Sequence, residues 1–425
     1  MVKWQRLLSF ALIGTLILPL AACGSSGAGK EAESDDQVKI VYARGKDVTG
    51  ATQKIIKAFE KKHPNIDVEY REMPADTGTS HDQYVTMLSA KSSEIDVFDL
   101  DVIWPAEFAQ AGYLVPLDRF IQKDGLDLEK YNDAAIEAGK YNGKQWTMPA
   151  YIDNGLLFYR KDIVKNPPKT WDELIQQAKR DQGEKGTKYG YLMQAKQYEG
   201  LVCNFIEFVE SYGGKVLDKN GKVAINSPDS VQGLKKMMEL AQSDVVPGNI
   251  TSFTELESHT SFIEGESPFI RNWPYQYALA QDKKQSKIVG KVGVTQLPEG
   301  DEKSAATLGG WATGINKFSK HKKEAWEFMK FLNGPEGQKI AAVHGGRAPT
   351  YMPLYDDAEV KKASPLFADK AYIEGVKNAV PRPISPQYPE ISDIIQIEVS
   401  KALAGKQSAE EAVKNMDQKL KKVLK

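Results

Sequence analysis

Two carboxylates separated by one residue, Asp99 and Asp101, are the best candidate for acid chemistry in the chain. They lie in the β-rich run 95–102, where alternate side chains point the same way. A glycoside hydrolase needs its two carboxylates on opposite sides of the bond that it cleaves, whereas this pair stands on one side of a substrate. We therefore favour a solvated strand end or a hydrogen-bonding ligand clamp. The alternative is a hydrolase that uses Asp99 or Asp101 with a partner such as Glu199.

Other reaction chemistry finds little support in the sequence. The motifs G-x-S-x-G and H-E-x-x-H and the zinc deaminase signature are absent. The five histidines, at 63, 81, 259, 321 and 344, are too far apart to share metal-ligand spacing on one helix. Of the two cysteines, Cys203 lies in an apolar run typical of a buried side chain. The sequence therefore predicts no catalytic residue, no metal site and no cofactor.

Aromatic residues beside polar, Gly or Pro residues are the more informative set. Four such segments contain Trp104, Tyr151 with Asp153, Trp273 with Tyr275, and Trp311. A sugar presents an apolar face and a rim of hydroxyls, so its sites combine aromatic plates with polar side chains. The contexts of these aromatics suggest exposure at sheet ends, and their number favours one shared cleft.

Two further tryptophans and two arginines are considered as ligand contacts. Trp171, at a helix start, and Trp326, between Ala325 and Phe328, are interpreted as packing residues. Arg382 is flanked by prolines that hold its backbone, which favours ligand contact. Arg347 follows a Gly-Gly pair and is interpreted as a clamp on the carbonyls of that turn.

Strands and helices alternate in the first part of the chain. Residues 38–43 and 66–70 are strand-like, and a helix over 51–62 ends before Pro64. A helix over 82–90 and a β-rich run over 95–102 follow. This alternation predicts a parallel sheet with helices on both faces. Thr170 and Glu173 have the spacing of a helix capping box, and two extended stretches lie at 145–159 and 292–298.

Length and charge narrow the class of protein. A chain of 425 residues is more than one compact core usually holds, so we expect two lobes or domains. The formal net charge of −1 offers no surface for neutralising phosphates, so a nucleic-acid partner is not expected.

The N-terminus has the layout of a secretory signal. Lys3 and Arg6 precede an apolar run, 7–20, that is too short to span a bilayer. The run ends in Leu-Ala-Ala-Cys23, which resembles the lipobox of bacterial lipoproteins. We expect a signal peptide over 1–22, a lipidated Cys23 and a flexible linker through 37, with the protein anchored on the extracytoplasmic face of the cell membrane. The alternative is an ordinary cleaved leader with an incidental cysteine.

Several segments together resemble the extracellular solute-binding proteins of bacterial sugar ABC transporters. They are the lipobox that ends in Cys23, the β-α-β start and the runs 95–101, 112–118, 170–174 and 333–338. The likeness extends over essentially the whole mature chain. Residues 197–203, followed by Gly213 and Gly214, are most similar to the branch that binds trehalose and maltose.

The resemblance implies a two-lobed α/β fold in which each lobe is a mainly parallel sheet flanked by helices, with a ligand cleft at the hinge. The first lobe would comprise 38–149 and 296–345, and the second 150–295 and 346–425. The family motifs imply ligand contacts at Asp101, Trp104, Tyr151, Asp153, Tyr198, Glu199, Trp273, Tyr275, Gly310, Trp311 and Arg382. The loop 44–48 lacks the glutamate that family members often place there.

The implied function is capture of an α-linked glucose disaccharide by a monomeric, lipid-anchored, non-enzymatic protein. Closure of the hinge would bury the sugar, and the protein would deliver it to a permease driven by a cytoplasmic ATPase. Two alternatives remain open: the secreted glycoside hydrolase, and a binding protein for a polyol, a glycerophosphodiester or a peptide. A phosphate ligand would favour more cationic groups than the single arginine, Arg382, placed in the cleft.

Overall fold

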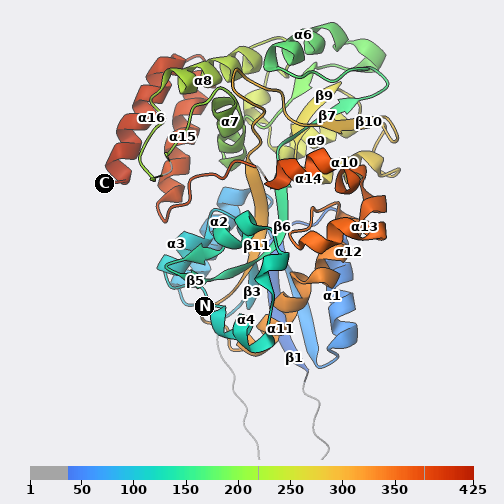
Figure 1. Ribbon diagram of the computed structural model, residues 1–425, viewed down its shortest axis with the longest axis vertical. Coiled ribbons are helices and arrows are strands. Elements are labelled where there is room, and N and C mark those ends of the chain that lie inside the picture. Colours follow the sequence, from blue (N-terminus) through green and yellow to red (C-terminus); the bar gives the residue numbers. More distant parts are fainter. Residues whose placement is uncertain (1–36, 219, 378) are drawn as a thin grey trace, which may run out of the picture. The chain divides into compact units, whose positions relative to one another are not determined.

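Five strands from separate parts of the chain form the first sheet. The computed structural model describes residues 37–218, 220–377 and 379–425, so the expected signal peptide and Cys23 lie outside the described residues. The strand order is β2 (Ile66–Met73), β1 (Val38–Gly45), β3 (Val97–Asp101), β11 (Leu308–Ile315) and β6 (Thr147–Asn154). Strand β11 therefore returns from late in the chain to lie between β3 and β6 (Figure 1).

The second sheet has four strands, in the order β10 (Val292–Thr295), β7 (Leu156–Arg160), β9 (Phe269–Asn272) and β8 (Tyr191–Leu192). Only Gly155 separates β6 of the first sheet from β7 of the second. A small hairpin pairs β4 (Lys140–Tyr141) with β5 (Lys144–Gln145). We call each sheet with its helices the first and the second lobe.

Both sheets are mainly parallel, as expected, but each contains one strand that runs against the others, β11 in the first sheet and β7 in the second. Strand β1 is parallel to β2 and β3, but β11 is antiparallel to β3 and β6. In the second sheet β7 is antiparallel to β9 and β10, and β8 alone pairs in parallel. The path of the chain explains these orientations, because a strand that crosses from one lobe to the other enters the sheet from the end opposite to that of its neighbours.

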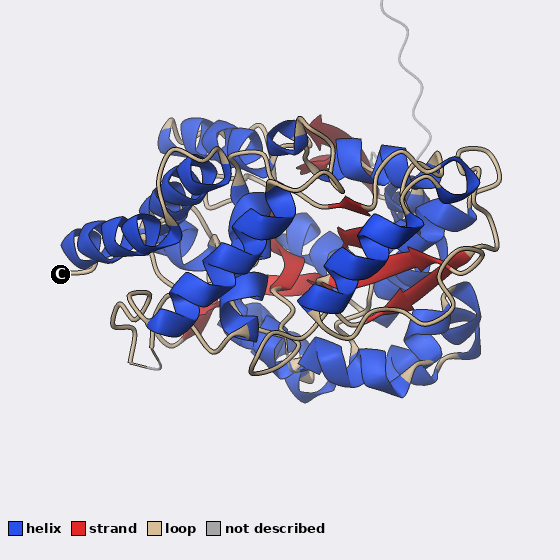
Figure 2. Ribbon diagram, turned by 90° about the horizontal axis from the view of Figure 1, so that it is seen from above, coloured by secondary structure: helices blue, strands red, loops and turns tan. Residues whose placement is uncertain are grey.

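Helices cover both sides of the strands (Figure 2). Around the first sheet lie α1 (Ala51–Lys62), α2 (Thr77–Ser89), α3 (Pro105–Gln110), α4 (Asp118–Asp124), α5 (Asp133–Ala138), α11 (Lys322–Leu332) and α12 (Pro335–Gly345). The second sheet is accompanied by α6 (Trp171–Asp181), α7 (Glu199–Ser211), α8 (Pro228–Ala241), α9 (Glu255–Ile263) and α10 (Tyr275–Gln281). The chain ends with α13 (Ala358–Ala363), α14 (Lys370–Lys377), α15 (Tyr388–Leu403) and α16 (Ala409–Val423). Helices α15 and α16 pack against α7 and α8 of the second lobe (Figure 1).

Local patterns explain several of these elements. Helix α1 has the predicted bounds and buries Ile55, Ile56 and Phe59. Helix α2 begins five residues before the predicted start at 82, because the Asp76 side chain accepts a hydrogen bond from the Thr79 amide and caps an earlier turn. Thr170 caps α6 as expected, but Glu173 accepts from the Lys169 amide instead of the Thr170 amide.

The apolar cores contain the residues interpreted as packing residues. Trp171 stacks on Phe208 with ring centroids 4.0 Å apart, and Trp326 stacks on Phe120 at 5.2 Å. Cys203 is buried, as predicted. None of the helices in the described part of the chain has both the length and the apolar stretch that a bilayer crossing needs.

Candidate functional site

Strand register gathers four of the predicted residues on one face of the first sheet. Trp311 of β11 lies opposite Asp101 of β3 on one side and opposite Tyr151 of β6 on the other. Two residues along β6, Asp153 lies opposite Gly309. Since side chains two apart in a strand share a face, Asp101, Trp311, Tyr151 and Asp153 face the same side.

A close backbone contact requires glycine at position 310. Gly310 has φ +128°, and a Cβ atom there would lie 2.5 Å from the Tyr151 carbonyl oxygen. The register shifts immediately afterwards, between Trp311 and Ala312. Such irregularities bend a strand and redirect its side chains. Gly310 thus shapes the strand beside Trp311 and has no side chain of its own to offer.

The expected exposure is wrong for two aromatics. Trp104 is only 3% exposed, because its ring lies in a core cluster with Phe108 and meets Trp311 edge to face at 5.5 Å. Tyr151 is 7% exposed. Trp311 is half-buried. Trp104 therefore supports Trp311 from behind.

Trp273 links the second lobe to the first. It follows β9, and the Arg271 guanidinium carbon lies 3.9 Å from its ring centroid. The indole N–H donates to Glu255 at 3.2 Å, and the other Glu255 oxygen accepts from the Tyr198 hydroxyl at 2.6 Å. On the first lobe, a Cβ at Gly309 would lie 2.9 Å from the Trp273 ring. The ring therefore sits against β11 beside Asp153.

Arg382 joins the two lobes through carboxylates. It donates to Asp101 of β3 at 2.6 Å and to Glu199 of α7 at 2.8 Å. Glu199 also accepts from the hydroxyls of Tyr388, at 2.5 Å, and Ser392, at 2.6 Å. Burial raises the pKa of Asp101, while Arg382 opposes that shift. In this structure Glu199 is occupied by donors from the protein itself.

Asp153 and Arg347 lack such partners. Asp153 is 8% exposed, and within the described ranges nothing donates a hydrogen bond to its carboxylate or forms an ion pair with it. Burial raises its pKa to about 6. The Arg347 guanidinium lies 4.2 Å from the Tyr151 ring centroid and makes no hydrogen bond with any described residue. The interpretation of Arg347 as a carbonyl clamp is therefore wrong.

The loop 44–48, which has no predicted ligand contact, contributes Arg44 to this region. This buried side chain faces Asp99 at 3.4 Å and donates to Thr52 at 3.0 Å. Asp99 also accepts from the Tyr42 hydroxyl at 2.6 Å. Asp99 is thereby held inside the first lobe, and the carboxylates Asp99 and Asp101 have different partners.

The sequence did not predict Arg44, Glu255 and Arg271 as residues of this region. It singled out Arg347, but not as a residue that faces the site. An arginine that follows Phe269 and Ile270 in a short strand-like run was one available signal, because a buried charge needs a partner. Tyr275 opens α10, where its ring meets His259 at 6.1 Å.

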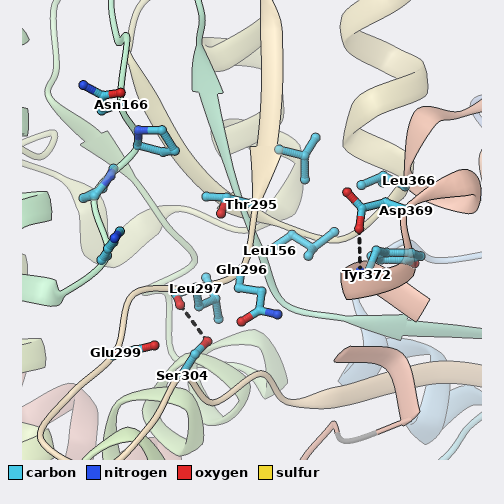
Figure 3. Close-up of a pocket in the computed structure, with 14 residues that line it drawn as sticks. Leu156, Asn166, Thr295, Gln296, Leu297, Glu299, Ser304, Leu366, Asp369 and Tyr372 are labelled. Carbon is cyan, nitrogen blue, oxygen red and sulfur yellow. Dashed lines mark hydrogen bonds between the residues drawn. The ribbon is translucent and has the colours of Figure 1, made fainter. Parts of the chain in front are cut away.

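A pocket of about 590 Å³ lies elsewhere (Figure 3). It is bordered by Leu156, Thr295, Leu297 and Tyr372, among others, and by none of the predicted site residues. In the described part of the chain no cluster of three or more histidine, cysteine or acidic side chains could hold a metal ion.

Two sheets linked by segments of chain that cross between them, with aromatic, acidic and basic side chains of both sheets' lobes facing each other, define the class of two-lobed binding proteins. The model of the family "bacterial extracellular solute-binding protein" matches residues 45–339, and the chain belongs to this family.

Known relatives agree with this assignment. A probable ABC transporter-binding protein of Deinococcus radiodurans is 36% identical over 380 residues, covering 86% of this chain and 88% of its own. The structure of maltose-bound T. maritima MalE3 has a TM-score of 0.86 and 38% identity, covering 91% of this chain and 100% of the other. A solute-binding protein from Thermotoga lettingae bound with α-D-tagatose has a TM-score of 0.82 and 28% identity, covering 91% and 100%.

The predicted family and the two-lobed α/β fold are confirmed. The chain is an extracellular solute-binding protein of an ABC importer, and its family works outside the cytoplasm. The lobe boundaries and the roles of the individual site residues stay predictions.

Proposed function

We propose that this protein captures an α-linked glucose disaccharide between its lobes and delivers it to an ABC permease driven by a cytoplasmic ATPase. The observation that carries the proposal is the face formed by Asp101, Trp311, Tyr151 and Asp153, with Trp273 against it from the other lobe. Maltose in the T. maritima relative, at 38% identity, supports an α-glucoside.

The chemistry of this face suits a neutral sugar. Half-buried Trp273 and Trp311 offer flat apolar surfaces for the C–H faces of two sugar rings. Asp153 offers an acceptor for hydroxyl groups. Because Arg382 already donates to both carboxylates, Asp101 and Glu199, a ligand need not bring a cation to pair with them.

Binding would be coupled to hinge motion. Predicted contacts come from both lobes, so a ligand touching all of them stabilises the arrangement in which the lobes meet. The permease would then recognise the ligand-loaded protein. We propose that the protein acts as a monomer and without catalytic turnover.

The test is titration calorimetry of a leaderless protein, residues 24–425, with maltose, trehalose and maltotriose. Saturable binding of at least one of them is expected. Tagatose and ribitol belong in the same panel, because relatives with these ligands share the fold at 28% and 26% identity. If only tagatose or ribitol bound, the ligand would be a smaller sugar or a polyol and not the proposed disaccharide. No heat from any sugar would reject the proposal.

A hydrolase would release glucose. In this structure Arg382 lies between Asp101 and Glu199 and donates to both, whereas hydrolytic carboxylates leave room for the scissile bond. Prolonged incubation of maltose and trehalose at high protein concentration should leave both intact by chromatography. Accumulation of glucose would overturn this part of the proposal.

The lipid anchor is proposed from the Leu-Ala-Ala-Cys23 motif alone. Metabolic labelling with a radioactive fatty acid should mark the full-length protein and not a Cys23→Ser variant. The unmodified variant should also leave the membrane fraction. Equal labelling of both proteins would contradict the anchor.

A further inference from the structure

Arg347 is held opposite Asp153 by the backbone. The Ile152 amide donates to the Ala348 carbonyl oxygen at 3.1 Å, and the two residues form an antiparallel bridge. In antiparallel pairing, the residue before one partner faces the residue after the other. Arg347 therefore lies across from Asp153, at the edge of β6 that β11 does not occupy.

The position of the Arg347 head group is set by stacking. Its guanidinium carbon lies 4.2 Å from the Tyr151 ring centroid, a distance typical of a cation–π contact. Its Nε atom is buried without a hydrogen-bond partner. A guanidinium can donate five hydrogen bonds, and here it makes none with any residue that the structure describes. Stacking fixes the group and leaves its donors available.

A facing arginine and aspartate usually form an ion pair, and these two do not. Asp153 has no donor of its own, although it is almost fully buried. A buried carboxylate without a donor carries a desolvation cost, and so does the buried Nε atom of the half-buried Arg347 side chain. Both costs are relieved if a third group, able to donate to the one and accept from the other, lies between them. A hydroxyl group has this chemistry.

We propose that Arg347 is a ligand-binding residue, and that Arg347 and Asp153 together bind hydroxyl groups of one sugar unit, with Asp153 accepting and Arg347 donating. The inference rests on the proposed function and sharpens it. It adds a contact outside the predicted set and assigns one sugar unit to the region between Trp273 and Tyr151, since the Trp273 ring lies beside Asp153.

The pair should make binding sensitive to pH. A hydroxyl donor favours ionised Asp153, whose pKa is raised by burial to about 6 before the ligand binds. Affinity should therefore be constant above that pKa and fall as the pH drops below it. The charged and titratable groups around Asp153 are Arg347, Arg271, Asp101, Tyr151, Tyr275, Tyr355 and Tyr372. Of these, Asp101 is the only other carboxylic acid, and Arg382 holds it as an ion pair.

The experiment compares maltose affinity of the wild type, Arg347→Met and Arg347→Lys by calorimetry, from about pH 8 to about pH 5. Loss of the Arg347 charge should weaken binding at least about tenfold at neutral pH. It should also move the pH at which affinity falls to a higher value, because Asp153 would then ionise less readily. Lysine keeps the charge but loses the planar fork, so Arg347→Lys should weaken binding while leaving the pH of the fall near that of the wild type.

A matched control is Arg71→Met, which removes an arginine from edge strand β2, where it pairs with Glu69 and Glu94. It should leave affinity and pH profile unchanged. Thermal unfolding without ligand checks that each variant folds. If Arg347→Met does not fold, the affinity of Arg347→Lys alone tests the inference. Wild-type affinity and an unshifted pH profile in the Arg347 variants would overturn the inference while leaving the proposed function intact. A wild-type protein that binds no sugar would overturn both.

Discussion

Trp273 lies so close to Gly309 that a side chain at position 309 would displace its ring. A Cβ atom at position 309 would lie 2.9 Å from the indole ring, and the ring could move away only by disturbing its stacking on Arg271 and its hydrogen bond to Glu255. The position of an aromatic plate from one lobe is thus fixed by the absence of a side chain on the other.

Gly309→Ala should displace this ring and weaken sugar affinity about tenfold, or about 1.4 kcal/mol. An added methyl group in a packed contact costs about 1–3 kcal/mol, and the expected loss of binding free energy lies within this range. Calorimetry with the sugar identified in the panel is the measurement. Gly248→Ala is the control, because open space surrounds position 248. Equal affinity in both variants would show that Trp273 does not contact the ligand.

Among the elements, β9 and α7 are joined by a buried ion pair. Arg271 of β9 donates to both carboxylate oxygens of Glu207 of α7, at 2.8 and 2.5 Å, and to Gln194 at 3.2 Å. The Thr307 amide, just before β11, donates to Glu207 at 3.2 Å. Because Arg271 also stacks on Trp273, this pair supports the candidate site from within the second lobe.

Glu207→Gln should leave the Arg271 charge buried and unpaired. Loss of one partner of a buried pair costs about 3–5 kcal/mol, so the free energy of unfolding in urea should fall by about 3 kcal/mol, and sugar binding should weaken as Arg271 and Trp273 relax. Glu210→Gln, on the same helix, removes a carboxylate that pairs with half-exposed Lys303 at 3.3 Å. That change should cost about 1 kcal/mol at most. Similar losses in both variants would contradict the role of the buried pair.

The elements also show what the sequence can and cannot predict. Helix α1 was predicted to the residue, because its apolar spacing and Pro64 are local signals. The place of β11 between β3 and β6 is a pairing over more than 150 residues, and no local pattern encodes it. The same holds for side-chain positions: a local motif was enough to make Trp311 a candidate, whereas the Arg347 contact with Tyr151 depends on a bridge between residues 152 and 348. Trp104 has a loop-like context but becomes buried because α2 and α3 enclose it.

At the scale of the whole molecule, the C-terminal segment ties the two lobes together. Tyr388 of α15 belongs to a core cluster of the first lobe, although α15 itself packs on the second. Arg382 lies between Asp101 of the first lobe and Glu199 of the second. A second, more exposed ion pair joins Asp76 and Lys196 at 3.7 Å. The two lobes are therefore held together in part by ion pairs.

Removal of Arg382 should release the lobes. In Arg382→Met, Asp101 and Glu199 would face each other as like charges in a buried setting, where their repulsion is strong. The ligand-free variant should show a larger radius of gyration by small-angle X-ray scattering than the wild type, and its sugar affinity should fall at least about tenfold, because part of the binding energy is spent on bringing the lobes together. Lys196→Met removes the exposed pair and should change neither quantity measurably. If Arg382→Met lowered affinity without any change in scattering, Arg382 would act on the ligand alone and not on the lobes; unchanged affinity would remove it from the site altogether.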